Sequence, residues 1–342
     1  MIDHRQEFPL PHLVATDPGI AWTKDDAVAI DAPPNAEAEL APEATWPADL
    51  ARDGSCGAVT PCVVSLPEGG LRMYYTQILP RPGHPAGAND YDNATTRILS
   101  ARSQEGAEWK PEPGVRLNAE QGGAGAFRVA SPEVVPMSGD RTKLRMYFES
   151  CPGTQAADTP IRSAVSDDGG TTWNLEPGVR LGGSGESTSA PRLLELEDGR
   201  CRLYCYHGGT GIISAISTDG GLTFAREPGV RIAKTLSYEA QTTFAPEVLR
   251  IENGGYRMYY AGYSDLTRAY ILTATSDDGL AWQKHPEPVI SPGGRFDRIK
   301  CSEMGITPLP SSPGPSFRFF YEACDGTTAE HRGVWRILSA SA

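Results

Sequence analysis

The chain has 342 residues and a formal net charge of −12 at pH 7, with 22% charged and 39% hydrophobic residues. This composition is typical of a globular protein, and the negative charge argues against nucleic acid or an anionic membrane as a partner. No run of about 18 apolar residues predicts a membrane span. The N-terminal MIDHRQEFPLPHLV also lacks the basic start and apolar core of a secretory signal. We therefore expect a cytoplasmic monomer.

The cysteines are seven in number and scattered, with no CxxC pair among them. An odd, irregularly spaced set is typical of reduced thiols in a cytosolic protein rather than of a disulfide framework. The sequence therefore predicts free thiols at Cys56, Cys62, Cys151, Cys201, Cys205, Cys301 and Cys324.

Three short patterns recur along the chain in a fixed order. The first is a turn with Asp or Glu, Gly and an aromatic residue: TDPGIAW from Thr16, SQEGAEW from Ser103, SDDGGTTW from Ser166, STDGGLTF from Ser217 and SDDGLAW from Ser276. The second is an arginine followed by apolar or aromatic residues, at Arg72, Arg145, Arg202, Arg257 and Arg318. The third surrounds a proline: TPCV from Thr60, SPEV from Ser131, APRL from Ala190, APEV from Ala245 and TPLP from Thr307. The chain is therefore a repeat protein.

Each repeat has the composition of short strands separated by tight turns. Four antiparallel strands repeated radially predict an all-β protein, a five-bladed β-propeller. The predicted blades cover approximately 55–118, 126–182, 186–233, 239–291 and 295–342, in one domain spanning 1–342. The last repeat lacks a fourth strand, and 12–30 supplies a turn and a strand with no blade before it. We expect this N-terminal strand to complete the last blade, and we expect the repeated turns to be structural.

The turns resemble the Asp-box turns of sialidases, which have six blades. The compound pattern RMYYAGYSDLTRAYILTATSDDGLAWQKHPEPVI, from Arg257 to Ile290, more closely resembles the five-bladed glycosidase superfamily. That superfamily includes invertases, levansucrases, arabinanases, β-xylosidases and mannoside phosphorylases. The resemblance implies three carboxylates that point from the innermost strands into a central cavity. One is a nucleophile or base, one a general acid, and one adjusts a pKa or holds the sugar.

In the arabinanase branch one acid follows an Ala-Pro on the inner strand, and the resemblance carries that position to Glu133 and Glu247. The same branch has an Asp before the first proline, where this chain has Thr60. Because Thr60 replaces this Asp, the residue that would act as the base in this chain is left open.

Period-two alternation extends the candidates. Counted from each proline, the +1 position is Cys62, Glu133, Arg192, Glu247 and Leu309, and the −5 position is Cys56, Phe127, Glu186, Gln241 and Glu303. Four residues after each repeated arginine lie Thr76, Glu149, Tyr206, Ala261 and Glu322. Carboxylates that interrupt a regular repeat are candidates for function. The predicted catalytic residues are Glu186, Glu303 and Glu149, with Glu186 and Glu303 as a pair about 5 Å or about 6.5–9.5 Å apart. The predicted substrate-binding residues are Glu133, Glu247, Glu322, Arg128, Arg192, His207, Gln241 and Asp53.

The leading hypothesis is a glycoside-active enzyme, a hydrolase of neutral sugars with paired carboxylates and no cofactor or metal. Its partner would be a small-molecule or oligosaccharide substrate. The alternatives are a lyase, isomerase or cyclase on the same propeller, or a carbohydrate-binding propeller without chemistry. A lectin would repeat its binding residues in every blade, whereas these acids are irregular. A sialidase would need an arginine cluster beyond the five repeated arginines.

Overall fold

The computed structural model describes residues 14–31, 57–80, 94–123, 126, 128–137, 140–152, 158–309, 317–326 and 334–342. Within these ranges the regular structure is almost entirely β-strand, which confirms the all-β prediction. The described helical elements are short 3₁₀ turns, η3 (Ala119–Gly122) and η4 (Ser237–Glu239). No helix of the described residues is long and apolar enough to cross a membrane.

Consecutive strands pair antiparallel into ladders, each named here after its first strand. The β3 ladder contains β3 (Gly57–Ser65), β4 (Leu71–Pro80), β5 (Ala94–Ser103), β6 (Lys110–Pro111) and β7 (Leu117–Asn118). The β8 ladder contains β8 (Arg128–Met137), β9 (Asp140–Cys151), β10 (Ile161–Ser166) and β11 (Asn174–Leu175). The β12 ladder contains β12 (Thr188–Glu195), β13 (Cys201–His207), β14 (Gly211–Ser217) and β15 (Ala225–Arg226). The β16 ladder contains β16 (Thr242–Ile251), β17 (Tyr256–Tyr263), β18 (Ala269–Ser276) and β19 (Gln283–Lys284). The β20 ladder contains β20 (Lys300–Pro308), β21 (Phe317–Cys324) and β22 (Trp335–Ser341).

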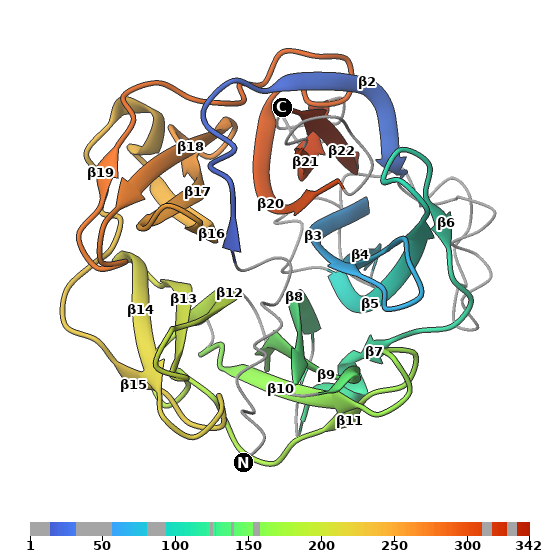
Figure 1. Ribbon diagram of the computed structural model, residues 1–342. Coiled ribbons are helices and arrows are strands. Elements are labelled where there is room, and N and C mark those ends of the chain that lie inside the picture. Colours follow the sequence, from blue (N-terminus) through green and yellow to red (C-terminus); the bar gives the residue numbers. More distant parts are fainter. Residues whose placement is uncertain are drawn as a thin grey trace.

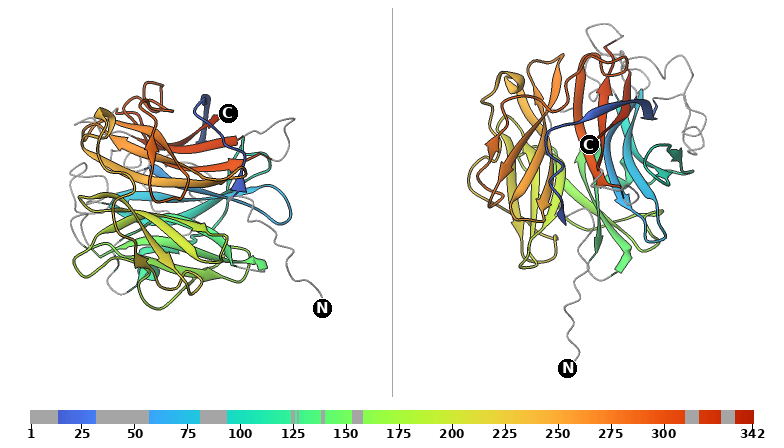
Figure 2. Two further views of the ribbon diagram at one scale, coloured as in Figure 1. Left: turned by 60° about the vertical axis from the view of Figure 1, so that its left-hand side comes forward. Right: turned by 45° about the horizontal axis from the view of Figure 1, so that its top comes forward.

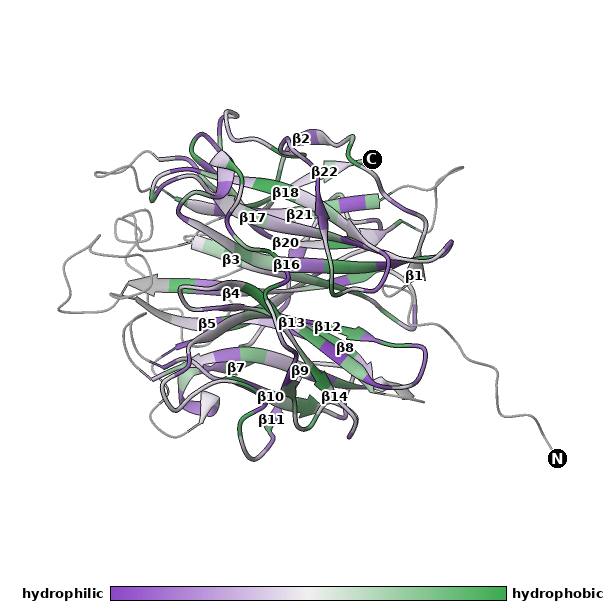
Figure 3. Ribbon diagram, turned by 90° about the vertical axis from the view of Figure 1, so that its left-hand side faces the viewer, coloured by the Kyte–Doolittle hydropathy of each residue, from purple (hydrophilic) through white to green (hydrophobic). Residues whose placement is uncertain are grey.

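The ladders surround a common centre, and the first strand of each lies nearest to it (Figure 1). Apolar side chains fill the space between neighbouring ladders; one cluster joins Tyr74 of β4 to Val129 of β8 and Trp173 beyond β10. Hydrophobic residues lie mainly on the strands and hydrophilic residues mainly in the connections (Figure 3). The core is therefore a set of interfaces between sheets.

The N-terminal segment lies against the end of the chain. β2 (Thr23–Ile30) pairs antiparallel with β22, in the register Thr23↔Ser341, and β1 (Val14–Ala15) pairs in parallel with β16. Lys24 Nζ lies 2.5 Å from the buried carboxylate of Asp297, which precedes β20. Figure 2 shows β2 beside the C-terminal strands. The strand predicted to complete the last repeat is thus paired with that repeat.

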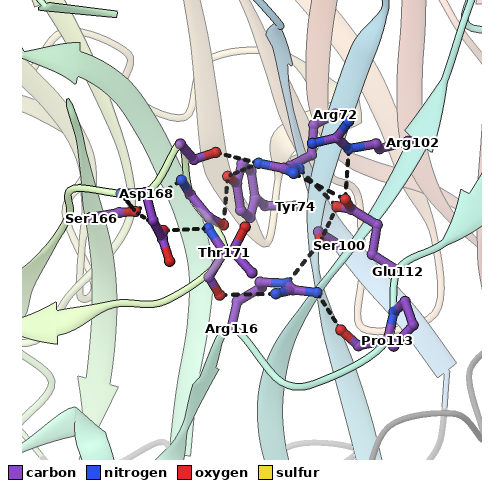
Figure 4. Close-up of polar contacts among 12 residues, drawn as sticks. Arg72, Tyr74, Ser100, Arg102, Glu112, Pro113, Arg116, Ser166, Asp168 and Thr171 are labelled. Atoms are coloured by element: carbon purple, nitrogen blue, oxygen red, sulfur yellow. Dashed lines mark hydrogen bonds and ion pairs between the residues drawn. The ribbon is translucent and has the colours of Figure 1, made fainter. Parts of the chain in front are cut away.

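The repeated turns contact the neighbouring ladder, and Figure 4 shows the turn that contains Ser166, Asp168 and Thr171. In the β8 ladder, Asp168 Oδ1 accepts the amides of Thr171 and Thr172, each at 3.0 Å. The Tyr74 hydroxyl of the β3 ladder donates to Gly170 O at 3.1 Å in this turn, and its ring meets Trp173 edge-to-face at 5.8 Å. The turn therefore holds two sheets together.

The same arrangement recurs around the centre. The equivalent ring contacts are Tyr147 with Phe224, Tyr204 with Trp282, Tyr259 with Trp22, and Phe320 with Trp109. The motif EPGVR, found at 112–116, 176–180 and 227–231, supports the same interface. In its first copy Glu112 binds Arg72 at 2.7 Å, and Arg116 donates to Thr171 O at 2.9 Å (Figure 4). The repetition noted in the sequence is therefore a repeated sheet-to-sheet contact.

Candidate active site

Each inner strand carries a β-bulge near its middle. In four of them the residue before the proline adopts a positive φ: Thr60 (55°), Ser131 (52°), Ala190 (50°) and Ala245 (48°). Such a φ is rare for residues other than glycine, and a bulge re-aims the neighbouring side chains. All four residues are buried, and together they form a layer around the centre.

The bulge of β20 lies between Cys301 and Met304 and contains Ser302 and Glu303. The prediction aligned this strand by Pro308, and that alignment is wrong. Gly305 pairs with Phe320, as Cys62 pairs with Tyr74. The layer position of Thr60, Ser131, Ala190 and Ala245 is therefore occupied in β20 by Glu303. The alignment failed because β20 has no proline at its bulge.

Second-strand side chains bind the bulge amides of the next ladder. Thr76 Oγ1 accepts the amide of Ser131 at 3.2 Å, and Glu322 Oε2 accepts that of Thr60 at 3.2 Å. Glu149 accepts the amide of Ala190. These three acceptors occupy the predicted position four residues after the repeated arginine. Two of the three are carboxylates, so this structural position also brings negative charge to the centre.

Glu149, Glu303 and Glu322 form the carboxylate cluster. Glu303 and Glu322 are buried, with 2% and 4% exposure, while Glu149 keeps part of its surface exposed. Ser302 Oγ donates to Glu322 Oε1 at 2.6 Å, and the Ser131 hydroxyl donates to Glu303. Glu149 Oε2 and Glu303 Oε1 are buried and have no hydrogen-bond partner among the described residues. Buried polar atoms without a hydrogen-bond partner are few in native proteins, and a catalytic role is one explanation for them.

Burial raises the pKa of all three carboxyls. The pKa of Glu322 rises to about 7, although the hydroxyl of Ser302 and the amide of Thr60 oppose the shift. The pKa of Glu303 is raised furthest, by burial and then by the charge of Glu322. The pKa of Glu149 is raised less, because Arg128 and the Ala190 amide favour its charged form. Like charges this close cannot all ionise, so the cluster holds a proton near neutral pH.

A second layer lies two residues further along the inner strands and surrounds Arg192. Its guanidinium binds Glu247 at 2.7 Å and lies 3.8 Å from Glu133. It also donates to Met304 O at 2.8 Å and to Pro61 O at 3.4 Å. One side chain of β12 thus contacts the inner strands β3, β8, β16 and β20. The pKa of Glu133 rises to about 7 by burial, and that of Glu247 is also raised.

The predicted substrate-binding residues Glu133, Arg192 and Glu247 therefore lie together, but as ion-pair partners. These three residues line a cavity of about 30 Å³ together with Cys62 and Gly305, which complete the layer. The residue after each of the five also lines it: Val63, Val134, Leu193, Val248 and Ile306. Gly305 replaces the predicted Leu309 at this position. A Cβ at Gly305 would lie 2.8 Å from Pro61 O, so the approach of the strands requires glycine there.

Two predicted site residues, Glu186 and Gln241, lie before their inner strands rather than within them. Glu186 precedes β12 in a bridge with Gly183; its side chain is 49% exposed and lies 3.9 Å from Arg226. The expected pairing of Glu186 with Glu303 is therefore not the arrangement found, because period-two alternation does not continue upstream of the strand. Gln241 is exposed before β16 and contributes its backbone to Tyr263 and Lys234.

Three predicted site residues remain, and one of them, Arg128, faces the charge of Glu149. Arg128 is buried and donates to Cys151 Sγ at 2.9 Å. His207 Nδ1 lies 3.0 Å from Thr210 Oγ1, and the pKa of His207 is lowered by burial and by Arg226. Asp53 lies outside the described residues. Among the residues that the structure describes, no group of three His, Cys, Asp or Glu side chains could hold one metal ion.

Sequence reasoning missed Ser302 and Tyr263. Ser302 bonds Glu322, and Tyr263 bonds Ser302 in turn. Ser302 precedes the layer position of β20, and Tyr263 lies beyond the position four residues after Arg257, so neither falls at a position that the repeated patterns mark.

Comparison with known proteins gives a match in structure. No family model and no curated protein sequence matches the chain. A thermostable family-43 glycoside hydrolase matches with a TM-score of 0.62 at 18% identity, over 83% of this chain and 89% of that one. A glycosyl hydrolase from Bacteroides ovatus matches with a TM-score of 0.67 at 13% identity, over 94% and 93%. The fold is that of the β-propeller glycoside hydrolases.

A family 117 glycoside hydrolase produced by Zobellia galactanivorans also matches this propeller, with a TM-score of 0.58 at 16% identity, over 84% and 85% of the two chains. At these identities the likeness establishes the propeller fold. Because one fold hosts many activities, the activity has to be argued from the site.

Proposed function

We propose that this chain is a glycoside-active enzyme, a hydrolase of neutral sugars, whose catalytic centre is the carboxylate cluster Glu149, Glu303 and Glu322. The observation that carries the proposal is the pair of orphaned oxygens, Glu149 Oε2 and Glu303 Oε1, on two carboxyls whose charges interact. Glycoside cleavage needs two carboxyl groups, one that gives a proton to the leaving oxygen and one that stays charged.

We assign the proton to Glu303 and the charge to Glu149. Glu303 has the most strongly raised pKa and would protonate the leaving oxygen as general acid. Glu149 is stabilised in its charged form by Arg128 and the Ala190 amide, and it would act as nucleophile or base. Glu322, fixed by Ser302 and Thr60, would help Glu303 to keep its proton. Arg128 and His207 would contribute to substrate binding from the surrounding positions.

The architecture that we propose for this centre is one domain, a five-bladed propeller with each ladder as a blade. Two observations support a ring closed by the N-terminal strand: β2 pairs with β22, and the turn at Asp17–Trp22 contacts Tyr259 as the internal turns contact their neighbours. The proposal includes a cytoplasmic monomer that acts on a monosaccharide derivative or oligosaccharide. Size-exclusion chromatography with light scattering tests the monomer.

A second candidate function is a lyase, isomerase or cyclase on the same propeller. The observation that favours it is Thr60, whose hydroxyl lies 2.6 Å from Thr76 Oγ1 where the arabinanase branch has an Asp. A carboxyl cluster that retains a proton can serve acid–base chemistry without water as a reactant. Incorporation of ¹⁸O from labelled water into the product would separate hydrolysis from these reactions.

The proposal is tested by a screen against aryl glycosides, with and without phosphate, followed by Glu303→Gln and Glu149→Gln in the reaction found. We expect each variant to lose about 10²–10⁴-fold in kcat, the usual contribution of a positioned acid or base. Activity should fall on the alkaline side as Glu303 loses its proton and on the acid side as Glu149 gains one. The alkaline limb should disappear in Glu303→Gln.

Glu197→Gln is the matched control, because Glu197 is 80% exposed and binds only Arg250 among the described residues. It should keep wild-type kcat. Full activity in both Glu149→Gln and Glu303→Gln would remove the cluster from catalysis.

A further inference from the structure

The guanidinium of Arg192 joins the second layer to the strand segments that hold the carboxylate cluster. Its Nη2 donates to Met304 O at 2.8 Å and to Pro61 O at 3.4 Å. Met304 directly follows Glu303 at the bulge of β20. Pro61 directly follows Thr60 at the bulge of β3, and the amide of Thr60 binds an acid of the cluster. One nitrogen atom therefore holds two bulges that fix the positions of cluster acids.

Arg192 is also tied to the third acid of the cluster through its own strand. The register of β12 shifts between Ser189 and Arg192, which places Ala190 in the bulge. The amide of Ala190, two residues before Arg192, donates to Glu149. The Arg192 side chain is buried, and its Nε donates to Glu247 at 2.7 Å, which fixes the guanidinium in place. Each of the three acids is therefore held by a strand that Arg192 contacts or belongs to.

The charge of Arg192 acts on both layers. The titratable groups that face it are Glu247, Glu133 and Cys62 of the second layer and Glu303 of the cluster. Glu303 is faced in turn by groups from five other strands: Glu322 of β21, Glu149 of β9, Arg192 of β12, the Ser131 hydroxyl of β8 and the Tyr263 phenol of β17. Arg192 is the cation in this set. Burial and then the charge of Glu322 raise the pKa of Glu303, and Arg192 opposes both.

We propose that Arg192 is a positioning residue: it holds the bulges beside the carboxylate cluster and couples the net charge of the second layer to the proton on Glu303. The proposal rests on the proposed function, which makes that proton the one given to the leaving oxygen. A cation favours the charged form of a nearby carboxyl group, and an anion favours the neutral form. Loss of Arg192 therefore raises the pKa of Glu303, whereas loss of the charge of Glu247 lowers it. A purely structural contact would not give shifts of opposite sign.

The experiment titrates Glu303 directly and needs no substrate. Infrared difference spectra over a range of pH follow the C=O stretch of protonated carboxyl groups, and the band missing from Glu303→Gln is assigned to Glu303. We expect its midpoint to rise by about one pH unit or more in Arg192→Met and to fall by a similar amount in Glu247→Gln. Glu247→Gln is nearly isosteric and leaves Arg192 beside Glu133, so it provides the measurement if Arg192→Met does not fold.

Lys284→Met is the matched control for loss of a cation from a buried ion pair. Lys284 Nζ lies 2.5 Å from the carboxylate of the fully buried Glu239, and β19, which carries Lys284, lies at the outside of the β16 ladder (Figure 1). This variant should lose stability but keep the Glu303 midpoint of the wild type.

Turnover of the aryl glycoside found in the screen separates the charge of Arg192 from its contacts. Arg192→Lys keeps the charge but replaces the planar fork by a single ammonium, which cannot hold Glu247 and two carbonyls together. Its Glu303 midpoint should stay near that of the wild type while kcat falls about tenfold at unchanged KM. In Arg192→Met and Glu247→Gln the alkaline limb of kcat should move with the midpoint.

The outcomes distinguish this proposal from the proposed function. An unchanged Glu303 midpoint in Arg192→Met and Glu247→Gln, or shifts of the same sign in both, overturns the role of Arg192. A shift of similar size in Lys284→Met, or full kcat in Arg192→Lys, also overturns it. If only Glu247→Gln folds, a midpoint that does not fall has the same meaning. Full turnover in Glu149→Gln and Glu303→Gln instead removes the proposed function, whatever the infrared midpoints show.

Discussion

Replacement of Arg192 by methionine tests how the centre of the propeller is held. Arg192 is 4% exposed and is the shared partner of Glu133, Glu247 and two backbone carbonyls of other inner strands. Methionine fills a similar volume but leaves both carboxyls without a counter-charge. Removal of one partner from a buried ion pair typically destabilises a protein by about 3–5 kcal/mol. We expect a loss of this size near pH 8, seen as a lower denaturant midpoint and melting temperature.

The pH dependence of this loss in stability shows whether it comes from the ionisation of Glu133 and Glu247. Burial already raises the pKa of Glu133 from 4.5 to about 7 and raises that of Glu247. A carboxyl with a raised folded-state pKa contributes stability that is present below about pH 4.5 and is lost as pH rises through the folded value. Without the charge of Arg192 both pKa values rise further, so the variant loses more stability than the wild type between about pH 5 and pH 8.

The assay is urea unfolding of the wild type and of Arg192→Met at about pH 5 and about pH 8. The loss at the higher pH should exceed the loss at the lower pH by at least about 1 kcal/mol, since one pKa unit corresponds to about 1.4 kcal/mol. The triple variant with Glu133→Gln and Glu247→Gln should recover part of the stability at the higher pH. An equal loss at both pH values, or no loss at either, would refute this reasoning.

Three further predictions concern the scaffold. Deletion of residues 1–30 should expose the edge of β22 and give oligomers, so a truncated monomer with an unchanged melting temperature would contradict the role of β2. Gly170→Ala should destabilise the protein by more than about 2 kcal/mol, because at φ +90° the new Cβ would overlap the Tyr74 hydroxyl. Gly169→Ala, at φ +72° with open space around it, should destabilise it by only about 1 kcal/mol. Equal losses in urea unfolding would show that the overlap at Gly170 is relieved. Thiol titration in denaturant should find seven thiols, since the six cysteines of the described residues form no disulfide, and a lower count would indicate one.

The strands and turns could be predicted because their signals are local. Alternation, the Asp and Gly of the turns, and the fixed order of three patterns each involve residues a few positions apart, and the structure has strands at those places. The pairing of β2 with β22 was also predictable, since the segment at 12–30 supplies a strand with no repeat before it and the last repeat lacks one. Glu303, Glu149 and Glu322 were found as interruptions of the repeat.

The grouping of those acids was not predictable from spacing. The bulge in β20 shifts its alignment relative to the prolines, so Glu303 lies at the layer position and Gly305 replaces Leu309. Glu186 was assigned to the inner face by counting, but it lies before the strand begins. A bulge or an early strand end changes the direction of every side chain counted through it, and the sequence carries no mark of either.

The sequence by itself determined that this chain is built from repeated antiparallel strands, because each repeat has to contact its neighbour with the same turn, arginine and aromatic ring. Only the tertiary structure decided which carboxyls meet. Glu133 and Glu247 follow the same proline motif as the acid of the arabinanase branch, yet Arg192 from a third strand binds both. Glu149 and Glu303 come from different ladders and are brought together by the packing of those ladders. Burial at that junction, rather than any local pattern, raises their pKa values.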